Sequence, residues 1–434
     1  MMKRGGDIIV IMAFMTMAMG IPIAPNSHAD GGMNADQLVE LAIESNPQVK
    51  AARARWDAAQ HQILQNYAPA DPVLTYSNID SRQGIGDAGE HGHAVSESFQ
   101  FPGKALLQAD SAKRNAQIAR LSYDATIRDL RAAVETGYYQ VLLDESVMGV
   151  NRDNIAALKQ VLQVTQVAYS ANQVTQADFI TSEFDLALAE QQERAYETAR
   201  TNDLVMLNQL LHRPPNAPLE LDRAMRLQPV KLPLDTLVDM ATRIRQEILQ
   251  TALAERNSNT ALELARMEYL PDFTVGYTFD YWLVNSFAPS QSPAGIPQVG
   301  STQTHTLSVG FNLPVFFWIK QREDVTSAEF ALKAARADLS SIRSQTEANV
   351  TQLFRSAQLA YETAQLYSKS LIPLARQDFH VALTAYQSNK LQFVALSGAL
   401  QRSYAAQVNY LQAANQFIAG RVALEQAIGA PLPQ

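Results

Sequence analysis

The feature that most constrains this chain is a run of strict alternation that ends at Pro314 and passes directly into a helical pattern. From His305 to Leu313, every second side chain is apolar or aromatic and the residues between are small or polar. This pattern predicts a strand with one apolar and one polar face. From Ala328 to Ile342 the apolar spacing changes to four and three, which indicates the seam of a helix packed on another helix. Few folds join such a strand directly to a long helix.

The same succession occurs twice, because Ser98–Pro102 is repeated as Gly310–Pro314, 212 positions later. We therefore predict two structural repeats, 30–212 and 234–429. Each repeat is expected to hold a helix, a β-hairpin and a long helical hairpin. The predicted bounds are 72–101 and 103–211 for the two hairpins of the first repeat, 272–313 and 315–428 for those of the second, 213–233 for the linker, and 430–434 for a tail.

The strand faces predict contact with lipid. The residues expected to face lipid are Phe99, Phe273, Val275, Tyr277, Phe279, Leu307, Val309 and Phe311. Aromatic residues near the strand ends fit an interfacial belt; they are Tyr281, Trp282, Phe316, Phe317 and Trp318. Four strands cannot close a barrel, so two or three chains would have to share one. The alternative is an ordinary soluble sheet with one buried face.

The long helices predict an elongated molecule. A helix from Gly103 to about Tyr169 would span roughly 100 Å at 1.5 Å per residue. Asn172 and Asn389 occupy equivalent turns, where asparagine can adopt the left-handed conformation that ends a helix. Thr175 and Asp178 are spaced as a capping box for the returning helix. Breaks are expected at Pro47 and at Pro373, and strand-to-helix junctions at Pro102, Gly103 and Pro314.

Composition excludes several classes of protein. The chain has 434 residues, a net charge of −8 and no cysteine. The charge argues against a nucleic-acid binder, and the lack of cysteine excludes disulfides and thiolate metal sites. We expect no enzyme, no cofactor and no metal centre, because polar residues are spread over helix faces instead of converging. Residues 1–29 are typical of an export signal ending at Ser27-His28-Ala29, with a membrane anchor helix as the alternative.

Three basic residues leave alternatives open. His91 and His93 could bind a metal ion, although two ligands without a third make a poor site, so loop histidines are the better interpretation. Lys104 follows Pro102-Gly103 at a helix start, where it could meet lipid headgroups or remain solvated.

The ordered motifs resemble those of the TolC-like outer-membrane efflux proteins, nearer the branch that serves heavy-metal and drug exporters. The likeness spans nearly the whole chain after the signal. It is carried by Leu41-Ala42-Ile43-Glu44-Ser45-Asn46-Pro47, by Phe101-Pro102-Gly103-Lys104, and by the turns Tyr169-x-x-Asn172 and Tyr386-x-x-Asn389.

The resemblance implies a homotrimer in the outer membrane of a Gram-negative bacterium, with a twelve-stranded β-barrel and an α-helical barrel extending through the periplasm. It implies docking on a periplasmic adaptor protein and, through it, on an inner-membrane pump of RND type or similar. It also implies a gate and adaptor-docking site at the helical tips; the residues concerned are Tyr169, Asn172, Thr175, Asp178, Tyr386, Asn389, Lys390 and Leu391.

The tip departs from the family pattern. Glycine is usual where Asn172 and Asn389 stand, and an arginine is usual where this chain has Leu391. Ala395 and Gly398 replace the acidic residues that commonly follow. We therefore expect an efflux duct whose closing contacts differ in part from those of its relatives. A duct for type I protein secretion and a periplasmic coiled-coil adaptor remain as alternatives, and the cargo is open.

Overall fold

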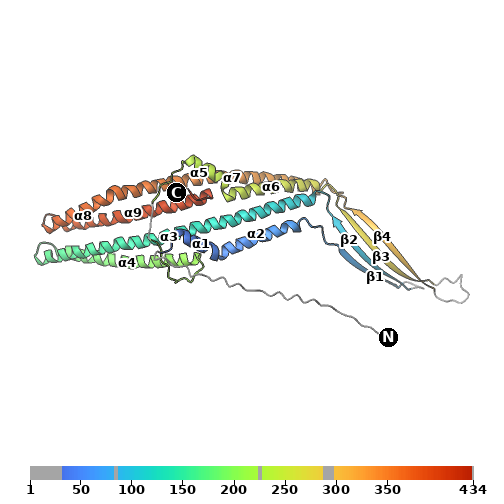
Figure 1. Cartoon of the computed structure of the whole chain (residues 1–434), viewed down its shortest axis with the longest axis horizontal. Helices are drawn as coiled ribbons and strands as arrows, with labels where there is room; N and C mark the ends of the chain where they lie inside the picture. The colour runs from blue at the N-terminus through green and yellow to red at the C-terminus, as the bar shows by residue number, and fades with distance from the viewer. Residues whose placement is uncertain (1–31, 83–86, 223–226, 287–297, 433–434) are drawn as a thin grey trace, which may run out of the picture.

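The computed structural model describes residues 32–82, 87–222, 227–286 and 298–432 of the chain. The predicted export signal, 1–29, lies outside these ranges. The described part is elongated, with a helical bundle that continues at one end into a four-stranded sheet (Figure 1). None of its helices is long and apolar enough to cross a bilayer.

The first half begins with two short helices, α1 (Ala35–Ser45) and α2 (Pro47–Gln65). They meet at the break predicted for Pro47, where Asn46 caps α2 and its side chain also donates to the Leu210 carbonyl, 3.0 Å away. Strands β1 (Val73–Arg82) and β2 (Asp87–Phe99) follow. The helical hairpin consists of α3 (Lys104–Ser170) and α4 (Gln176–Leu210).

The second half repeats this order. It contains α5 (Leu234–Ile244), α6 (Gln246–Met267), β3 (Phe273–Ser286), β4 (Gln298–Phe311), α7 (Lys320–Leu366), α8 (Ile372–Gln387) and α9 (Phe393–Ile428). A single π-helical turn, η1 (Tyr367–Leu371), joins α7 to α8 immediately before Pro373, where a kink was predicted. Helix α9 ends at Ile428, and Gly429 follows as its cap with a positive φ of 90°, the left-handed conformation that glycine adopts without strain.

The sheet is antiparallel throughout, in the order β1-β2-β3-β4. Directly paired residues share a face, so the register defines two surfaces. One row of four contains Leu74, Val95, Tyr277 and Leu307, and the adjacent row on the opposite face contains Thr75, Ala94, Thr278 and Thr306. In these rows, the sheet is therefore apolar on one side and small and polar on the other.

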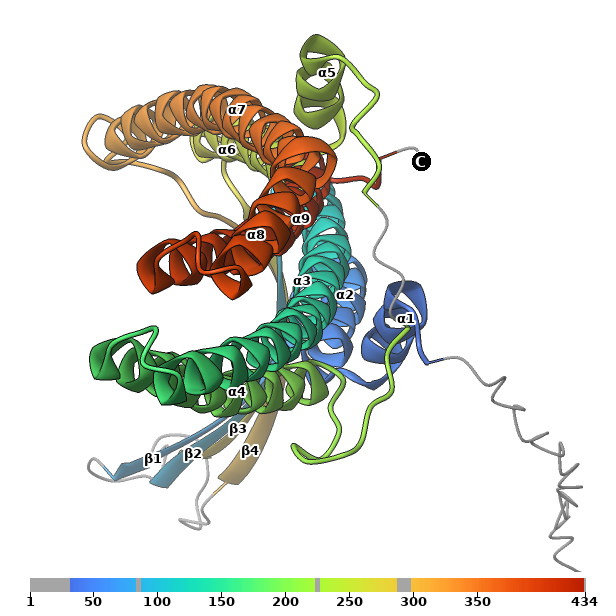
Figure 2. The ribbon, with the colours of Figure 1, turned by 90° about the vertical axis from the view of Figure 1, so that its left-hand side faces the viewer.

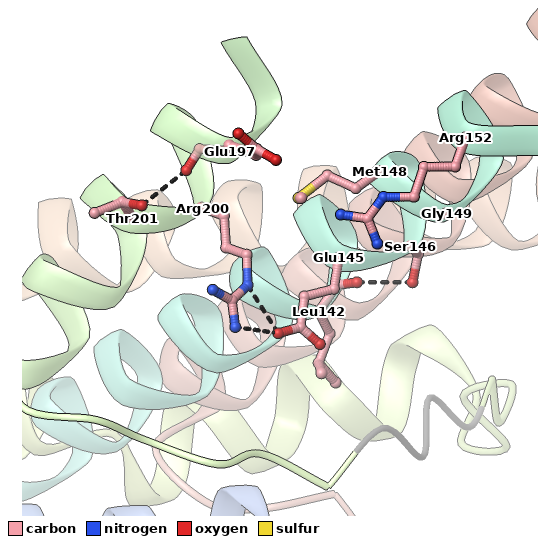
Figure 3. A pocket seen from close by; sticks show the side chains of 9 residues that line it. All are labelled: Leu142, Glu145, Ser146, Met148, Gly149, Arg152, Glu197, Arg200 and Thr201. Carbon is pink, nitrogen blue, oxygen red and sulfur yellow. Dashed lines mark hydrogen bonds and ion pairs between the residues drawn. The ribbon is translucent and has the colours of Figure 1, made fainter. Parts of the chain in front are cut away.

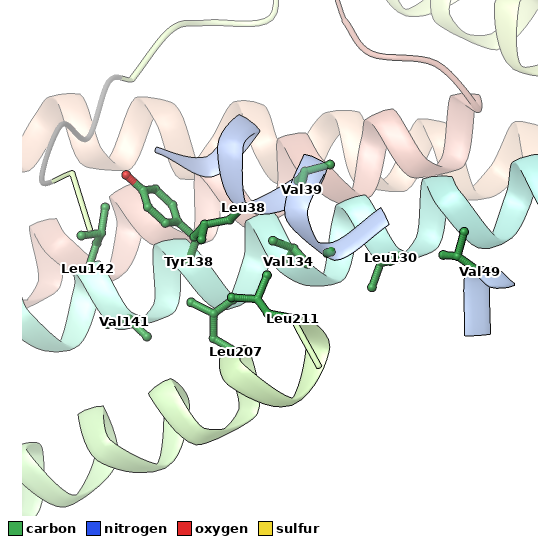
Figure 4. Packing of buried hydrophobic residues seen from close by; sticks show 11 residues of the cluster. Leu38, Val39, Val49, Leu130, Val134, Tyr138, Val141, Leu142, Leu207 and Leu211 are labelled. Atoms are coloured by element: carbon green, nitrogen blue, oxygen red, sulfur yellow. The ribbon is translucent and has the colours of Figure 1, made fainter. Parts of the chain in front are cut away.

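The helices form a curved wall. Helix α4 packs on α3, α3 on α9, and α9 on α7 and α8, and the arc of this wall is visible in Figure 2. Near the middle of the bundle, α1 packs on α3 and the end of α4 through a core of buried hydrophobic residues, aliphatic except for Tyr138 (Figure 4). The second half has the corresponding core, in which Leu237 and Ala241 stand where Leu38 and Ala42 stand in the first.

Candidate functional site

The two helical turns at the far end of the bundle have the same backbone geometry. Asn172 and Asn389 both have a φ of 57°, the left-handed conformation that the sequence predicts. In each turn, the amide after the asparagine donates across the helix end: Gln173 N to Ala168 O at 2.9 Å, and Lys390 N to Ala385 O at 2.8 Å. These bonds satisfy carbonyls that the helix end leaves unpaired.

The helices that return from these turns begin differently. The predicted capping box is confirmed: Asp178 N donates to Thr175 Oγ1 at 3.2 Å, and Thr175 N donates to Asp178 Oδ2 at 3.1 Å. Helix α9 begins after Gln392, whose side chain makes no capping bond. The first hairpin therefore closes with local hydrogen bonds that the second does not have.

The tyrosines before the two turns also differ. Tyr169 is 39% exposed and stacks on Phe179 with ring centroids 5.7 Å apart. Tyr386 is 6% exposed, and its hydroxyl lies 3.4 Å from Thr165 Oγ1 of the first hairpin. Burial raises the pKa of Tyr386; the Thr165 hydrogen bond opposes this change, and the Asp178 carboxylate adds to it. The second tip thus packs against the first within one chain.

A shared apolar cluster joins the two tips. It contains Leu158 and Val161 of α3, Ala189 of α4, and Tyr386, Phe393 and Leu396 of the second hairpin; Leu391 packs at its margin. Polar contacts support it farther along, including Ser397 Oγ to Asp185 Oδ2 at 3.1 Å. This arrangement can hold a tip closed by packing, whereas Lys390 is exposed beside it.

The first strand-to-helix junction is built around a buried lysine. Lys104 is 2% exposed, and its Nζ lies 3.0 Å from Asp272 Oδ1 and 3.2 Å from Glu268 Oε1. Asp272 Oδ1 also accepts the Phe101 amide at 2.8 Å. Both expected environments of Lys104, lipid headgroups and solvent, are therefore wrong, because its partners lie some 170 residues away in the sequence. Gly103 precedes it with a φ of 106°, which a residue with a side chain adopts only with strain.

The register places all eight residues predicted to face lipid on the apolar side of the sheet. Phe99, Phe273 and Phe311 form the row nearest the helices, and Phe99 stacks on Phe273 at 5.3 Å. Glu97 interrupts the next row, beside Val275. Trp282 pairs with Thr302 on the opposite, polar face, so it does not belong to a belt on the apolar side.

The histidines of the sheet contact aromatic rings. Tyr76 Oη lies 3.2 Å from His91 Nδ1, the ring of His93 lies 5.1 Å from that of Tyr76, and Tyr277 Oη lies 2.7 Å from His305 Nδ1. Within the described ranges, no three potential ligands gather as a metal site would require.

The seam between α3 and α4 contains charges that the sequence analysis did not select. An open groove of about 770 Å³ lies along it (Figure 3). Arg200 Nη2 lies 2.6 Å from Glu145 Oε1, and Arg152 Nε lies 2.6 Å from Glu193 Oε1. These residues alternate with apolar ones on very long helices, so only the fold distinguishes them from ordinary surface charges.

One turn from this groove, Asp144 is 7% exposed and its Oδ2 has no donor beside it in the described part of the chain. Burial raises the pKa of the Asp144 carboxyl to about 7, and a hydrogen bond with Asp203 and the charge of Asp203 act in the same direction. Burial and the neighbouring carboxyl of Asp203 thus both favour the protonated form of Asp144.

Comparisons with known proteins agree with this fold. The family model described as outer membrane efflux protein matches residues 38–212 and 237–430, whereas no curated protein matches the chain. Among solved structures, the fold is similar to VceC of Vibrio cholerae (TM-score 0.76, 17% identity, 92% of this chain and 97% of that one). It is also similar to CusC, with a TM-score of 0.76, 14% identity and coverage of 96% of this chain and 99% of that one. The open state of the MtrE outer membrane channel of Neisseria gonorrhoeae gives a TM-score of 0.74, 16% identity and coverage of 93% of this chain and 90% of that one.

The neighbours confirm the predicted fold class of duplicated long helical hairpins with four strands in each chain. The family match covers both halves, which agrees with a location in the outer membrane and a long periplasmic extension. The chain belongs to the outer membrane efflux protein family, whose members are transport channels and not enzymes.

Proposed function

We propose that three copies of the chain form one passive exit duct of a tripartite efflux system. In this proposal, a twelve-stranded β-barrel lies in the outer membrane and a helical tunnel crosses the periplasm. A periplasmic adaptor protein docks at the helical tips and connects the duct to an inner-membrane pump of RND type or similar, which supplies the energy. The observation that carries the proposal is a sheet with two chemically distinct faces and two open edges.

The sheet supports a shared barrel. In the described part of the chain, β1 and β4 each have a paired strand on one side only. Hydrocarbon does not tolerate open strand edges, and four strands are too few to close a barrel. Twelve strands would bring every edge into a pair and leave room for a passage. The face with Thr75, Thr278 and Thr306 would then line the passage, and the apolar face would meet lipid.

The helical wall also has two edges with exposed apolar side chains. On α4, Ile180 and Phe184 are 53% and 64% exposed; on α8, Leu374 and Val381 are 61% and 62% exposed. Pairing the α4 edge of one subunit with the α8 edge of the next would cover both sets. At about 25 cal/mol per Å² of apolar surface, such burial is a substantial driving force for association.

The tips support a gate that relies mainly on packing. Tyr386 and Phe393 are buried in the cluster that joins the two hairpins, and Thr175 and Asp178 complete the first turn. A bound adaptor would open the tip by binding the open state more tightly than the closed one. A duct for type I protein secretion would share this geometry, and no described contact favours it; a periplasmic adaptor does not fit the family.

Cysteine cross-linking tests the shared barrel, because the chain has no cysteine of its own. Phe311 in the second repeat is equivalent to Phe99 in the first, which is 212 residues earlier. The elements before β3 are shifted by a different number, because α5 and α6 begin 199 residues after α1 and α2. The observed pairing of Ser98 with Thr274 then predicts that Gly310 pairs with Thr75 of the partner subunit.

Oxidation of a Gly310→Cys/Thr75→Cys variant should convert most monomers into covalent trimers that still conduct ions in planar bilayers. A Gly310→Cys/Tyr76→Cys variant is the matched control, since Tyr76 lies on the opposite face and should cross-link poorly. A monomer that remains water-soluble without detergent and does not cross-link would overturn the proposal.

A further inference from the structure

Trp282 is the one aromatic residue on the polar face of the sheet, in the part of the strands that the structure describes. The register pairs it with Thr302 of β4. The other aromatic residues of the strands, including its neighbour Tyr281, lie on the apolar face. Trp282 is 39% exposed, so its indole is accessible on a face that otherwise carries small and hydroxyl side chains.

Asp280 lies on the same face, because it stands two residues before Trp282 on the same strand. Its carboxylate leans over the neighbouring strand β2. A Cβ added at Gly92 would lie 2.7 Å from Asp280 Oδ1 and would clash with Ser77 Oγ, so this glycine leaves the space for both polar groups. Among the residues that the structure describes, none forms an ion pair with Asp280, and its negative charge is not neutralised within the chain.

The rest of the polar face carries no positive charge. The row of Asp280 and the row of Thr278 otherwise contain only serine, threonine, alanine and glycine. Along the four strands as described, no lysine, arginine or histidine lies on this face. The register also gives Glu90 as the partner of Trp282 on β2. A cation that approaches Trp282 therefore meets an aromatic ring and carboxylates, and no repelling charge.

The two residues lie far from the helices and inside the sheet. Strand β3 is paired on both sides within its own chain, so this row does not depend on how the outer edges join. Asp280 is seven residues from the start of β3 at Phe273, or about 23 Å from the helical end of the sheet (Figure 1). The inference rests on the proposed barrel, because only closure turns the polar face toward a passage.

We propose that Asp280 and Trp282 form a subsite for organic cations on the wall of the passage, one in each subunit, near its outer mouth. The carboxylate attracts the positive charge, and the indole face binds the cation through its π electrons. The subsite is weak, because a passage has to release what it binds. The cargo that it favours is a singly charged and partly apolar cation, over a neutral molecule or an anion of the same size.

Tryptophan fluorescence tests the pair, since the chain has three tryptophans. A Trp56→Phe/Trp318→Phe variant leaves Trp282 as the only emitter, in trimers held in lipid nanodiscs. N-methylpyridinium is an aromatic cation that quenches indole. Adding Asp280→Asn should weaken its quenching of Trp282 about fivefold at low ionic strength, the factor that one carboxylate at contact distance contributes in water. Acrylamide, a neutral quencher, should act equally on both variants.

Ion currents provide the second test. In planar bilayers at low ionic strength, N-methylpyridinium on the extracellular side should reduce the potassium current. Trp282→Leu should raise the concentration that halves this current about threefold, through loss of the cation–π interaction. Asp280→Asn should raise it about fivefold and lower the permeability ratio of potassium to chloride. Tyr281→Leu is the matched control, because this neighbouring aromatic residue lies on the apolar face and should leave the block unchanged.

The outcomes separate the subsite from the duct. Conducting trimers whose Trp282 is quenched equally by N-methylpyridinium with and without Asp280, or whose block is unchanged by Trp282→Leu, would overturn the subsite and leave the duct intact. Strong quenching of Trp282 by lipids brominated along the acyl chain would also overturn it, because the indole would then face lipid. If no covalent Gly310→Cys/Thr75→Cys trimers form and no current is seen, the duct fails and the subsite with it.

Discussion

The two halves of the chain share one plan, and their long helices show where they diverge. Helix α3 runs unbroken for 67 residues, whereas the second half divides a stretch one residue longer into α7, a π-helical turn and α8. Before this turn, equivalent buried residues of the two halves are 216 residues apart in the sequence, as Val134 and Val350 are. After it, Tyr169 and Tyr386 correspond at 217. One inserted residue therefore produced the turn, because a π-helix accommodates an extra residue without changing the packing on either side.

The comparison teaches that the halves have different mechanical roles. The first half is continuous, capped at Thr175 and tied to the sheet by buried Lys104. The second half has a π-helical turn before Pro373, an α9 without a side-chain cap and an exposed junction. We infer that the first hairpin is the rigid part of the wall and the second the part that moves when the tip opens.

The largest expected effect concerns the buried lysine. Lys104→Ala removes a buried lysine and leaves Asp272 and Glu268, whose side chains are 30% and 51% exposed, without their cation; it should lower the free energy of unfolding by about 2 kcal/mol. Lys320→Ala, at the equivalent but exposed position, should change it by less than about 0.5 kcal/mol. Denaturant unfolding of the detergent-solubilised protein measures both. Equal effects would show that the two junctions are equivalent after all.

The next effect depends on pH. The Asp144 pKa of about 7 in the folded protein exceeds its ordinary value of 3.8, so the folded state keeps a proton that the unfolded state releases. The contribution of Asp144 to stability is therefore greatest below about pH 4 and is lost as pH rises through 7. Asp144→Asn should raise the free energy of unfolding by about 2 kcal/mol at pH 8 and by little at pH 4.

The second half supplies the control for this prediction, because Ala360 stands where Asp144 stands in the first half. Ala360→Ser should therefore leave the pH dependence of unfolding unchanged. If the free energies of unfolding of the wild type and of Asp144→Asn differ by the same amount from pH 4 to pH 8, the ionisation of Asp144 does not contribute to the pH dependence of stability.

The π-helical turn can be removed. Deletion of Ser368 should convert Tyr367–Leu371 into regular α-helix and stiffen the second hairpin, which should reduce the frequency of channel opening about tenfold, or ~1.4 kcal/mol. Deletion of Ala157 from α3 is the control. Because α3 has no π-helical turn that could compensate for the missing residue, the residues after it should lose their packing register, and the trimer should be less stable to heat. An unchanged opening frequency after the Ser368 deletion would show that the π-helical turn has no role in gating.

The smallest effect concerns the caps. Thr175→Ala should cost about 1 kcal/mol, because it removes a hydroxyl that accepts the Asp178 amide. Gln392→Ala should cost almost nothing, since that side chain makes no capping bond. Transferring the cap with Gln392→Thr/Ala395→Asp should stabilise the second tip by a few tenths to about 1 kcal/mol and lower leak conductance. A double variant with a higher leak conductance than the wild type would contradict the inference that the first hairpin is the more rigid of the two.

Much of the fold was predictable because its signals are local. The alternation around Phe311, the proline break at Pro47 and the left-handed asparagines each depend on a few consecutive residues. Pairing of the strands into one sheet also follows the alternation. The site was predictable only in part, since the sequence selected Tyr169 and Tyr386 as equivalent residues and their surroundings differ completely.

The sequence alone determined the repeats, the two kinds of strand face and the turns, because hydrophobic periodicity and backbone preferences act over short distances. Only the tertiary structure decided that Lys104 is buried, that Trp282 lies on the polar face, and that Asp144 meets another carboxyl. These outcomes depend on residues from distant parts of the chain, such as Asp272 beside Lys104. Because such partners determine the burial and the charge state of a side chain, the residues next to it in the sequence do not predict them.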